Sequence, residues 1–308
     1  MDRRKFFRNT TYSVAGMIIG SNTSEAYAKD KSSPSSYDIM KEVMKYRKID
    51  AHEHVGLGGT VETQIDIADR LNIDKLVISK PIPDYAANTP PATPEAFRKC
   101  NDEVLSAMKR YPGRYLGQVY VNPVYGKESL EEIKRCVDQG MIGLKVYYQV
   151  KINDPLFYPV IEKMIDLKMI ILMHAVTAIG FAGHRPKYGN QQPNASTAED
   201  FVEAAKRYPE AMFQYAHTGG GGDWEYTCKA IKDYPNIYVD TSGSNNEGSM
   251  IDAVLKYLGE DRMFFGTDSS YYQGVGVILS SHLTDIQKKK IFFDNFNNIL
   301  RKSGRNVD

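Results

Sequence analysis

Short apolar runs alternate with segments of helical periodicity along most of this chain. Apolar runs such as 75–79, 115–121 and 169–174 are bounded by Pro, Asn-Pro or turn residues, which is typical of buried strands. Segments such as 60–71 and 94–110 place apolar residues three or four positions apart, which is typical of amphipathic helices. Strands that alternate with helices in this way predict a parallel α/β fold.

The pattern predicts eight strands in series, each followed by helical sequence. We expect the strands at residues 49–54, 75–79, 115–121, 142–147, 169–174, 211–216, 236–240 and 262–268. Thr93, followed by Pro94, and Thr284 are expected to cap the helices over 94–110 and 285–300. Eight such units in one chain predict a single (β/α)8 TIM barrel.

The N-terminus is expected to lie outside the barrel. Asp2-Arg3-Arg4-Lys5-Phe6-Phe7-Arg8 precedes a mildly apolar stretch and the small-x-small triplet Ala26-Tyr27-Ala28. This resembles a twin-arginine export signal and predicts a periplasmic protein. The expected organisation is a signal over 1–28, a leader over 29–45 and the barrel domain over 46–308. A basic helix that is retained is the alternative interpretation.

Composition narrows the class of partner. The chain has 308 residues, of which 42% are hydrophobic, and a net charge of +1. No basic patch and no apolar run near the length of a membrane span stand out, so neither nucleic acid nor membrane insertion after signal removal is expected. A small-molecule substrate is expected, and the sequence leaves homo-oligomerisation open. The three cysteines, Cys100, Cys136 and Cys228, have no metal-binding spacing and are expected to be buried free thiols.

Two histidines close together mark the end of the first strand. In Asp50-Ala51-His52-Glu53-His54, alternation along a strand puts His52 and His54 on one face and Glu53 on the other. Two imidazoles on one face can hold a divalent ion, although such a pair alone is weak evidence. Glu53 is expected to have a packing or salt-bridging role.

The remaining histidines fall at equivalent places. Of six histidines in the chain, His174 and His217 stand after the fifth and sixth strands, and Asp268 ends the eighth. Active sites of (β/α)8 barrels lie at the carboxyl ends of the strands, so these residues would meet on one rim. Any one of these residues could be an ordinary polar residue at a strand end. Four of six histidines and an aspartate on the same rim are much harder to attribute to chance.

This set of residues predicts a metal site. His52, His54, His174 and Asp268 supply three nitrogens and one oxygen, which suits one divalent ion, Zn²⁺ first and Mn²⁺ or Fe²⁺ next. The ion would lower the pKa of a bound water. Asp268 would act as the general base, and His217 would lie beside the metal and orient water or stabilise negative charge.

These motifs resemble the amidohydrolase superfamily, and within it the amidohydrolase-related group called amidohydrolase family 2. The resemblance rests on Asp-Ala-His-Glu-His-Val-Gly, on His174, on His217 in Ala-His-Thr-Gly-Gly and on Gly266-Thr267-Asp268. It implies the metal ligands and catalytic histidine just given. Some branches of the superfamily carry a carboxylated lysine after the fourth strand that bridges two metals, and Lys145 stands there. A salt bridge or a substrate contact is the alternative role for this lysine.

The resemblance leaves the reaction open. The first hypothesis is a metal-dependent hydrolase acting on a C–O or C–N bond of a small molecule such as a lactone or amide. The second is a metal-dependent non-oxidative decarboxylase of an aromatic or unsaturated acid, and the third is a metal-binding barrel without activity. His184, Arg185 and Tyr147 are candidates for binding substrate, with a solvated loop as the alternative for the first two.

Overall fold

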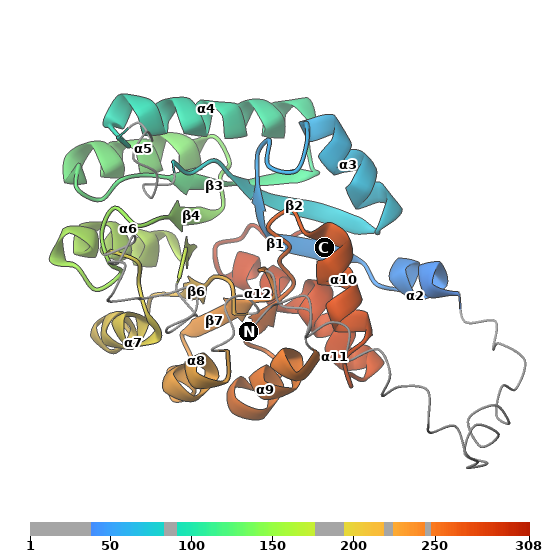
Figure 1. Cartoon of the computed structure of the whole chain (residues 1–308). Coiled ribbons are helices and arrows are strands. Elements are labelled where there is room, and N and C mark those ends of the chain that lie inside the picture. Colours follow the sequence, from blue (N-terminus) through green and yellow to red (C-terminus); the bar gives the residue numbers. More distant parts are fainter. Residues whose placement is uncertain (1–37, 83–90, 176–193, 219–223, 244–247) are drawn as a thin grey trace, which may run out of the picture. The chain divides into compact units, whose positions relative to one another are not determined.

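The computed structural model describes residues 38–82, 91–175, 194–218, 224–243 and 248–308. Residues Met40–Asp308 form one compact unit. In this unit eight parallel strands pair in chain order, so the predicted (β/α)8 barrel is confirmed (Figure 1). The strands are β1 (Lys48–His54), β2 (Ile73–Ser79), β3 (Tyr115–Tyr120), β4 (Gly143–Val146), β5 (Ile170–Met173), β6 (Phe213–Tyr215), β7 (Ile237–Asp240) and β8 (Met263–Phe264).

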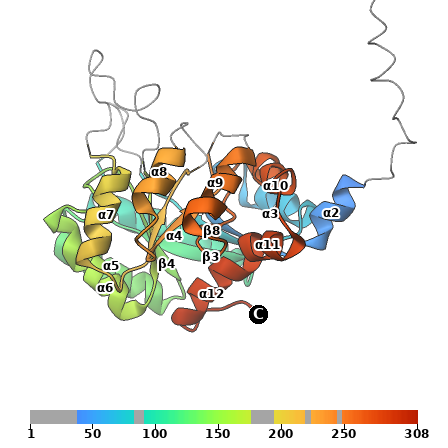
Figure 2. The ribbon, with the colours of Figure 1, turned by 90° about the horizontal axis from the view of Figure 1, so that it is seen from below.

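Helices surround the strands, as Figures 1 and 2 show from two directions. They are α2 (Ile39–Lys45), α3 (Val61–Arg70), α4 (Pro94–Arg110), α5 (Gly126–Asp138), η1 (Pro155–Phe157), α6 (Tyr158–Leu167), α7 (Ala198–Arg207), α8 (Trp224–Ile231), α9 (Gly248–Leu258), α10 (Tyr271–Leu279), α11 (Asp285–Lys289), η3 (Lys290–Asp294) and α12 (Asn295–Lys302). Within the described residues, no helix is long and apolar enough to cross a membrane.

Threonine side chains begin several of these helices. The Thr93 hydroxyl accepts from the Ala96 amide at the start of α4, where Pro94 is the first helical residue. Thr284 forms a reciprocal capping box with Gln287 at the start of α11. Both predicted caps are confirmed, because a threonine oxygen supplies the acceptor that the first helical amides lack.

The core has two parts. A large apolar cluster fills the space between the strands and the surrounding helices. A second cluster lies against α12, where Phe296, Ile299 and Leu300 pack on Ile49 and Phe264 from the first and last strands. The three cysteines are buried and free, as expected. Part of the expected leader also belongs to the core, since Val43 of α2 is buried there.

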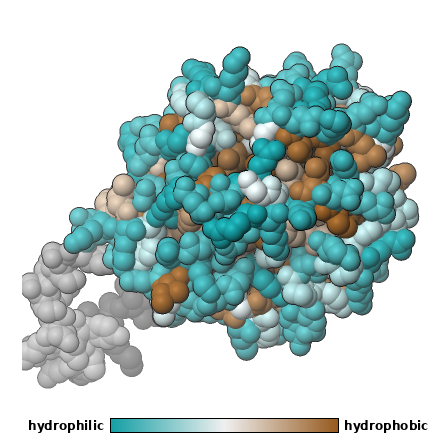
Figure 3. Space-filling view, turned by 180° about the vertical axis from the view of Figure 1, so that it is seen from behind, coloured by the Kyte–Doolittle hydropathy of each residue, from teal (hydrophilic) through white to brown (hydrophobic). Residues whose placement is uncertain are grey.

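The outer surface carries mostly polar side chains. The face in Figure 3 is largely hydrophilic, with hydrophobic residues gathered towards one side of it. Large exposed apolar side chains on the described surface include Tyr272 and Ile286. Scattered apolar residues of this kind are normal on a folded protein.

The strand that carries the histidine pair contains an irregularity. Along β1 and β2, Asp50 pairs with Leu76 and Glu53 with Ile78, so three steps on β1 oppose two steps on β2. An extra residue of this kind turns the following side chains relative to strict alternation. Ala51 packs in the second apolar cluster, the one against α12, while His52, the next residue, reaches the polar rim.

The eighth unit departs from the sequence prediction. The strand expected over 262–268 has only two residues in β8, and the chain beyond it runs along β1. The Ala51 amide donates to the Phe265 carbonyl and the Asp268 amide to the His52 carbonyl, each at 2.8 Å, which connects this segment to the first strand. Helix α10 was not predicted, because Gly274 and Gly276 weaken its helical pattern.

Candidate metal centre

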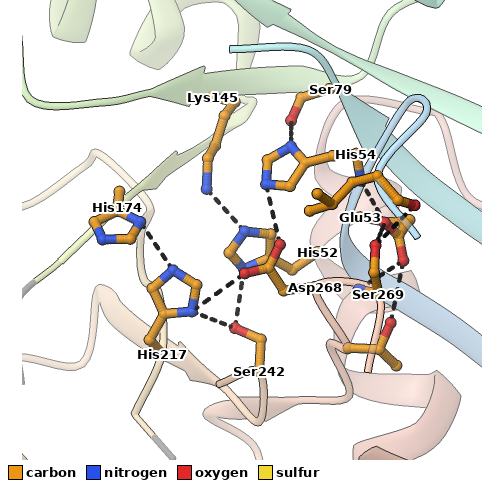
Figure 4. Close-up of polar contacts among 12 residues, drawn as sticks. His52, Glu53, His54, Ser79, Lys145, His174, His217, Ser242, Asp268 and Ser269 are labelled. Atoms are coloured by element: carbon orange, nitrogen blue, oxygen red, sulfur yellow. Dashed lines mark hydrogen bonds and ion pairs between the residues drawn. The ribbon is translucent and has the colours of Figure 1, made fainter. Parts of the chain in front are cut away.

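The predicted rim residues come together at the carboxyl ends of the strands (Figure 4). His52 and His54 lie on β1 and Lys145 on β4, whereas His174 directly follows β5. His217 lies two residues beyond β6 and Asp268 four residues beyond β8. These side chains contact one another or share a partner, as described below.

His52 is fully buried between a cation and an anion. Its Nε2 lies 2.8 Å from Lys145 Nζ, and its Nδ1 lies 3.0 Å from Asp240 Oδ2. Burial lowers the pKa of Lys145 to about 8, although Asp268 and Asp240 act in the opposite direction. Lys145 therefore reaches the site, as the sequence suggested, and holds the nitrogen of His52 that faces the rim.

His174 and His217 form a pair. His217 Nε2 lies 2.9 Å from His174 Nδ1, with ring centroids 4.4 Å apart. Burial lowers the pKa of His217 to about 3, and it holds the pKa of His174 well below its ordinary value. His54 behaves alike, with burial lowering its pKa to about 4. These rings are neutral at pH 7, which is the form that binds a metal ion.

Asp268 faces two of the histidines. Its Oδ2 lies 3.8 Å from His217 Nδ1 and its Oδ1 lies 3.3 Å from His54 Nε2. Burial would raise the pKa of Asp268, but the contacts with His54 and His52 hold it below the usual range. Within the described residues Asp268 Oδ1 has no partner with hydrogen-bond geometry.

The donor set fits a divalent cation. His52, His217 and Asp268 each offer a ligand atom, and these atoms lie within 4.8 Å of one another. Neutral imidazoles and a carboxylate are the ligands that Zn²⁺ and similar ions take from proteins. Asp268 Oδ1, buried and without a hydrogen-bond partner among the described residues, is a further place where a cation would be stabilised. This group contains His217, which the sequence placed beside the metal, so the division between ligand and neighbour stays a prediction.

The turn that carries Asp268 has an unusual backbone. Asp268 and Ser269 have φ of 47° and 70°, in the left-handed region that non-glycine residues rarely adopt. Glu53 holds this turn in place. Its carboxylate accepts from the Ser269 amide at 2.9 Å, from Ser269 Oγ at 2.6 Å and from the His54 amide at 2.7 Å. Glu53 is thus a backbone clamp, and among the described residues it forms no salt bridge.

We expect Glu53→Ala to weaken this turn. The Ser269 and His54 amides would lose their buried acceptor, which costs about 1–3 kcal/mol for each unsatisfied group. Denaturant unfolding of the metal-free protein measures the loss. Glu53→Gln keeps one acceptor oxygen and should be less destabilised. Equal stability of Glu53→Ala and the unaltered protein would contradict the clamp.

Aromatic side chains line one side of the site. The His174 ring lies 4.7 Å from the Tyr147 ring and 4.5 Å from the Tyr148 ring, centroid to centroid. Tyr147, a predicted substrate contact, is therefore next to the histidine pair. The other two predicted contacts, His184 and Arg185, lie outside the described residues. The sixth histidine, His282, lies on the surface, where its side chain is 94% exposed.

Sequence reasoning missed several partners of the histidines. Asp240 and Ser242, at the end of β7, contact His52, and Ser242 also contacts His217. Ser79, at the end of β2, lies 3.0 Å from His54 Nδ1. Ser79 and Asp240 end predicted strands and Ser242 lies two residues beyond one, so the rule that located the histidines could have located them. Serine and aspartate are common at such positions, however, and neither stood out.

The rim of this barrel brings together imidazoles, a carboxylate and a buried lysine. This places the protein in the class of (β/α)8 proteins whose strand ends are suited to a divalent metal ion. A family model described as Amidohydrolase (Amidohydro_2) matches residues 49–289. The chain therefore belongs to the amidohydrolase family, whose members generally use a divalent metal.

Solved structures with the same fold include two decarboxylases and a hydratase. A dihydroxybenzoic acid decarboxylase from Polaromonas sp. JS666, with bound manganese and an inhibitor, is 18% identical with a TM-score of 0.65 over 83% of this chain and 97% of that one. 5-Carboxyvanillate decarboxylase from Sphingomonas paucimobilis is 15% identical, with a TM-score of 0.65 over 83% of this chain and 99% of that one. 4-Oxalomesaconate hydratase from Rhodopseudomonas palustris is 19% identical, with a TM-score of 0.58 over 79% of this chain and 81% of that one. At these identities the similarity establishes the fold.

Proposed function

We propose that this protein is a metal-dependent hydrolase that cleaves a C–O or C–N bond of a small molecule, such as a lactone or an amide. His52, His54, His174 and Asp268 would hold one divalent ion, Zn²⁺ first and Mn²⁺ or Fe²⁺ next. Asp268 is also the proposed general base, and His217 the neighbouring catalytic histidine. The family and the donor set support the use of a metal.

The position of Asp268 supports hydrolysis most directly. Its two oxygens face His54 and His217, and among the described residues neither forms a hydrogen bond with a carboxyl group that would share a proton with it. Imidazoles beside both oxygens favour the carboxylate form, which accepts a proton from water. A decarboxylase would need the same side chain to deliver a proton to carbon.

The chain's own residues would position the reactants. A divalent ion, when bound, supplies Lewis acidity that makes water a better nucleophile and polarises a substrate oxygen. Asp268 would accept the proton of the attacking water and later return it to the leaving group. His217, held by His174, would orient that water or stabilise negative charge on the substrate.

Lys145 decides how many ions the site holds. We propose a single ion, with Lys145 unmodified and bonded to His52. In the alternative, Lys145 carries a carboxyl group and bridges two ions. The number of metal atoms per chain, measured on purified protein, distinguishes the two.

Decarboxylation is the second candidate, and Lys145 is the observation that favours it. This buried cationic side chain could neutralise a substrate carboxylate next to His52. Tyr147 and Tyr148 would suit an aromatic acid beside the histidine pair. Two of the similar structures are decarboxylases, at 15–18% identity, and point the same way.

A paired assay tests the proposal. Purified protein loaded with Zn²⁺ or Mn²⁺ is offered lactone and amide panels, and separately aromatic and unsaturated carboxylic acids with CO₂ release as the readout. We expect turnover of a lactone or amide, lost by more than about 100-fold in Asp268→Asn because the proton acceptor is removed. Asp252→Asn, a change on the outer helix α9, serves as the matched control. Release of CO₂ without any lactone or amide turnover would refute the hydrolase proposal in favour of the decarboxylase.

A further inference from the structure

We propose that Asp240 and Ser242 are positioning residues that fix the ring tautomers of His52, His217 and His174. They thereby decide which nitrogen of each ring is left free for a metal ion. This inference deepens the proposed function and rests on it for the role of the metal. The end of β7, which carries both residues, has no other part in the proposed chemistry.

Asp240 is a fully buried carboxylate surrounded by donors. Its Oδ2 accepts from Gln214 Nε2 at 2.8 Å and lies 3.0 Å from His52 Nδ1. Its Oδ1 accepts from the amides of His217 and Ser242, each at 3.1 Å, and from Ser242 Oγ at 2.5 Å. A carboxylate can only accept hydrogen bonds, so His52 must carry its proton on Nδ1. His52 Nε2 is then bare and accepts from Lys145.

Ser242 passes the same constraint to the histidine pair. Its single hydroxyl proton is committed to Asp240, so the Ser242 oxygen acts as an acceptor towards the rings. His217 Nδ1, at 3.0 Å from Ser242 Oγ, must therefore hold a proton. His52 Nδ1 also lies 3.1 Å from this oxygen, which strengthens the same tautomer of His52.

The last link is the contact between the two rings. A neutral His217 with its proton on Nδ1 has a bare Nε2, which accepts from His174 Nδ1 at 2.9 Å. His174 is then protonated on Nδ1 and presents a bare Nε2. One carboxylate thus orders three imidazoles, directly for His52 and through Ser242 for the other two.

This order separates the roles of the rings. His52 and His174 each keep a bare Nε2 that a cation can take, in the case of His52 by displacing Lys145. The Nε2 lone pair of His217 is already used by His174. Metal-binding histidines generally depend on such partners at the other ring nitrogen, and loss of the partner costs about 10–100-fold in metal affinity.

Ring tautomers can be read without metal or substrate. Histidine labelled with ¹⁵N in the metal-free protein, at pH 8, reports which ring nitrogen carries the proton through long-range ¹H–¹⁵N correlations. The signals are assigned by single His→Gln substitutions. We expect the Nδ1–H form for His52, His174 and His217 in the unaltered protein.

Two variants separate the two arms of the network. Asp240→Asn replaces an obligate acceptor by an amide that can donate, and should convert His52 from the Nδ1–H form, as carboxylate-to-amide changes do beside other imidazoles. Ser242→Ala should release the Nδ1–H form of His217 and His174 while His52 keeps its own through Asp240. Glu132→Gln is the matched control, because Glu132 is an equally buried carboxylate whose partners, Asn101, Arg98, Arg135 and Cys136, lie outside the histidine network.

Zn²⁺ affinity, measured by competition with a chromogenic chelator, provides the second readout. We expect about 10–100-fold weaker binding in Asp240→Asn, a smaller loss in Ser242→Ala and none in Glu132→Gln. Unchanged tautomers in both variants would overturn the proposal, even if stability fell, because Asp240 would then only brace the backbone. If Asp240→Asn does not fold, the His217 and His174 signals of Ser242→Ala still decide. Altered tautomers with no metal binding in any form would uphold the positioning role and refute the proposed function.

Discussion

The double variant His52→Ala/His54→Ala is expected to lose the bound divalent ion. Both imidazoles reach the rim from β1, where both are buried, and burial lowers the pKa of His54 to about 4. Without them the proposed donor set retains one histidine and one carboxylate, too few for a closed site of about four ligands. Metal analysis after dialysis against metal-free buffer should show near-complete loss, with activity falling in parallel.

His282→Ala is the control for this experiment, because His282 is an exposed histidine on the described surface. Its metal content should match that of the unaltered protein. Circular dichroism must show the double variant folded, since Lys145 and Asp240 lose their partner when His52 is removed. Undiminished metal in a folded double variant would mean that the ion is held elsewhere.

The barrel could be predicted from the sequence because its signal is local. Most of the buried parallel strands are short apolar runs followed by a segment of helical periodicity, and four of the helices begin at a threonine cap. The prediction was wrong where long-range contacts override the local pattern. The 262–268 run is as apolar as a strand, yet the pairing of Phe265 and Asp268 with β1 replaces regular pairing beyond Phe264.

The candidate site was predictable by residue type but not by contact. Histidines are few, so four of them at the carboxyl ends of predicted strands stood out, and the structure brings them to one rim. Asp240 and Ser242 contact these histidines directly. Aspartate and serine are too common at strand ends, however, for the sequence to indicate this role. The contacts of each ring nitrogen also depend on the bulge in β1 and on the left-handed turn at Asp268. Neither backbone feature could be predicted from the sequence.

The opposite end of β1 carries a second buried lysine that the sequence did not single out. Lys48 is fully buried, and its Nζ donates to the carbonyl oxygens of Val43, Tyr46 and Leu71 at 2.7, 2.7 and 2.8 Å. Three acceptors match the three protons of an ammonium group. Lys48 thus ties the chain entering β1 to the end of α3.

Burial makes this lysine a source of pH-dependent stability, since it lowers the pKa of Lys48 to about 7. In the unfolded chain the group titrates near its ordinary value of 10.5. Between these two pH values the unfolded state binds the extra proton, so raising the pH favours the folded state. The contribution rises with a slope of up to about 1.4 kcal/mol per pH unit from pH 7 to 10 and is constant below both pKa values.

We therefore expect Lys48→Met to remove a rising component from the pH dependence of unfolding. The difference in free energy of unfolding between the unaltered protein and Lys48→Met should grow by several kcal/mol from pH 7 to pH 10, because methionine binds no proton in either state. Urea unfolding at half-unit steps of pH measures it, and the difference cancels the titration of groups that both proteins share. Lys99→Met, at an exposed position of α4, should leave the slope unchanged. Parallel curves for Lys48→Met and the unaltered protein would show that the three carbonyl oxygens keep Lys48 protonated across the whole range. The clamp would then act through hydrogen bonds alone, with no proton released on folding.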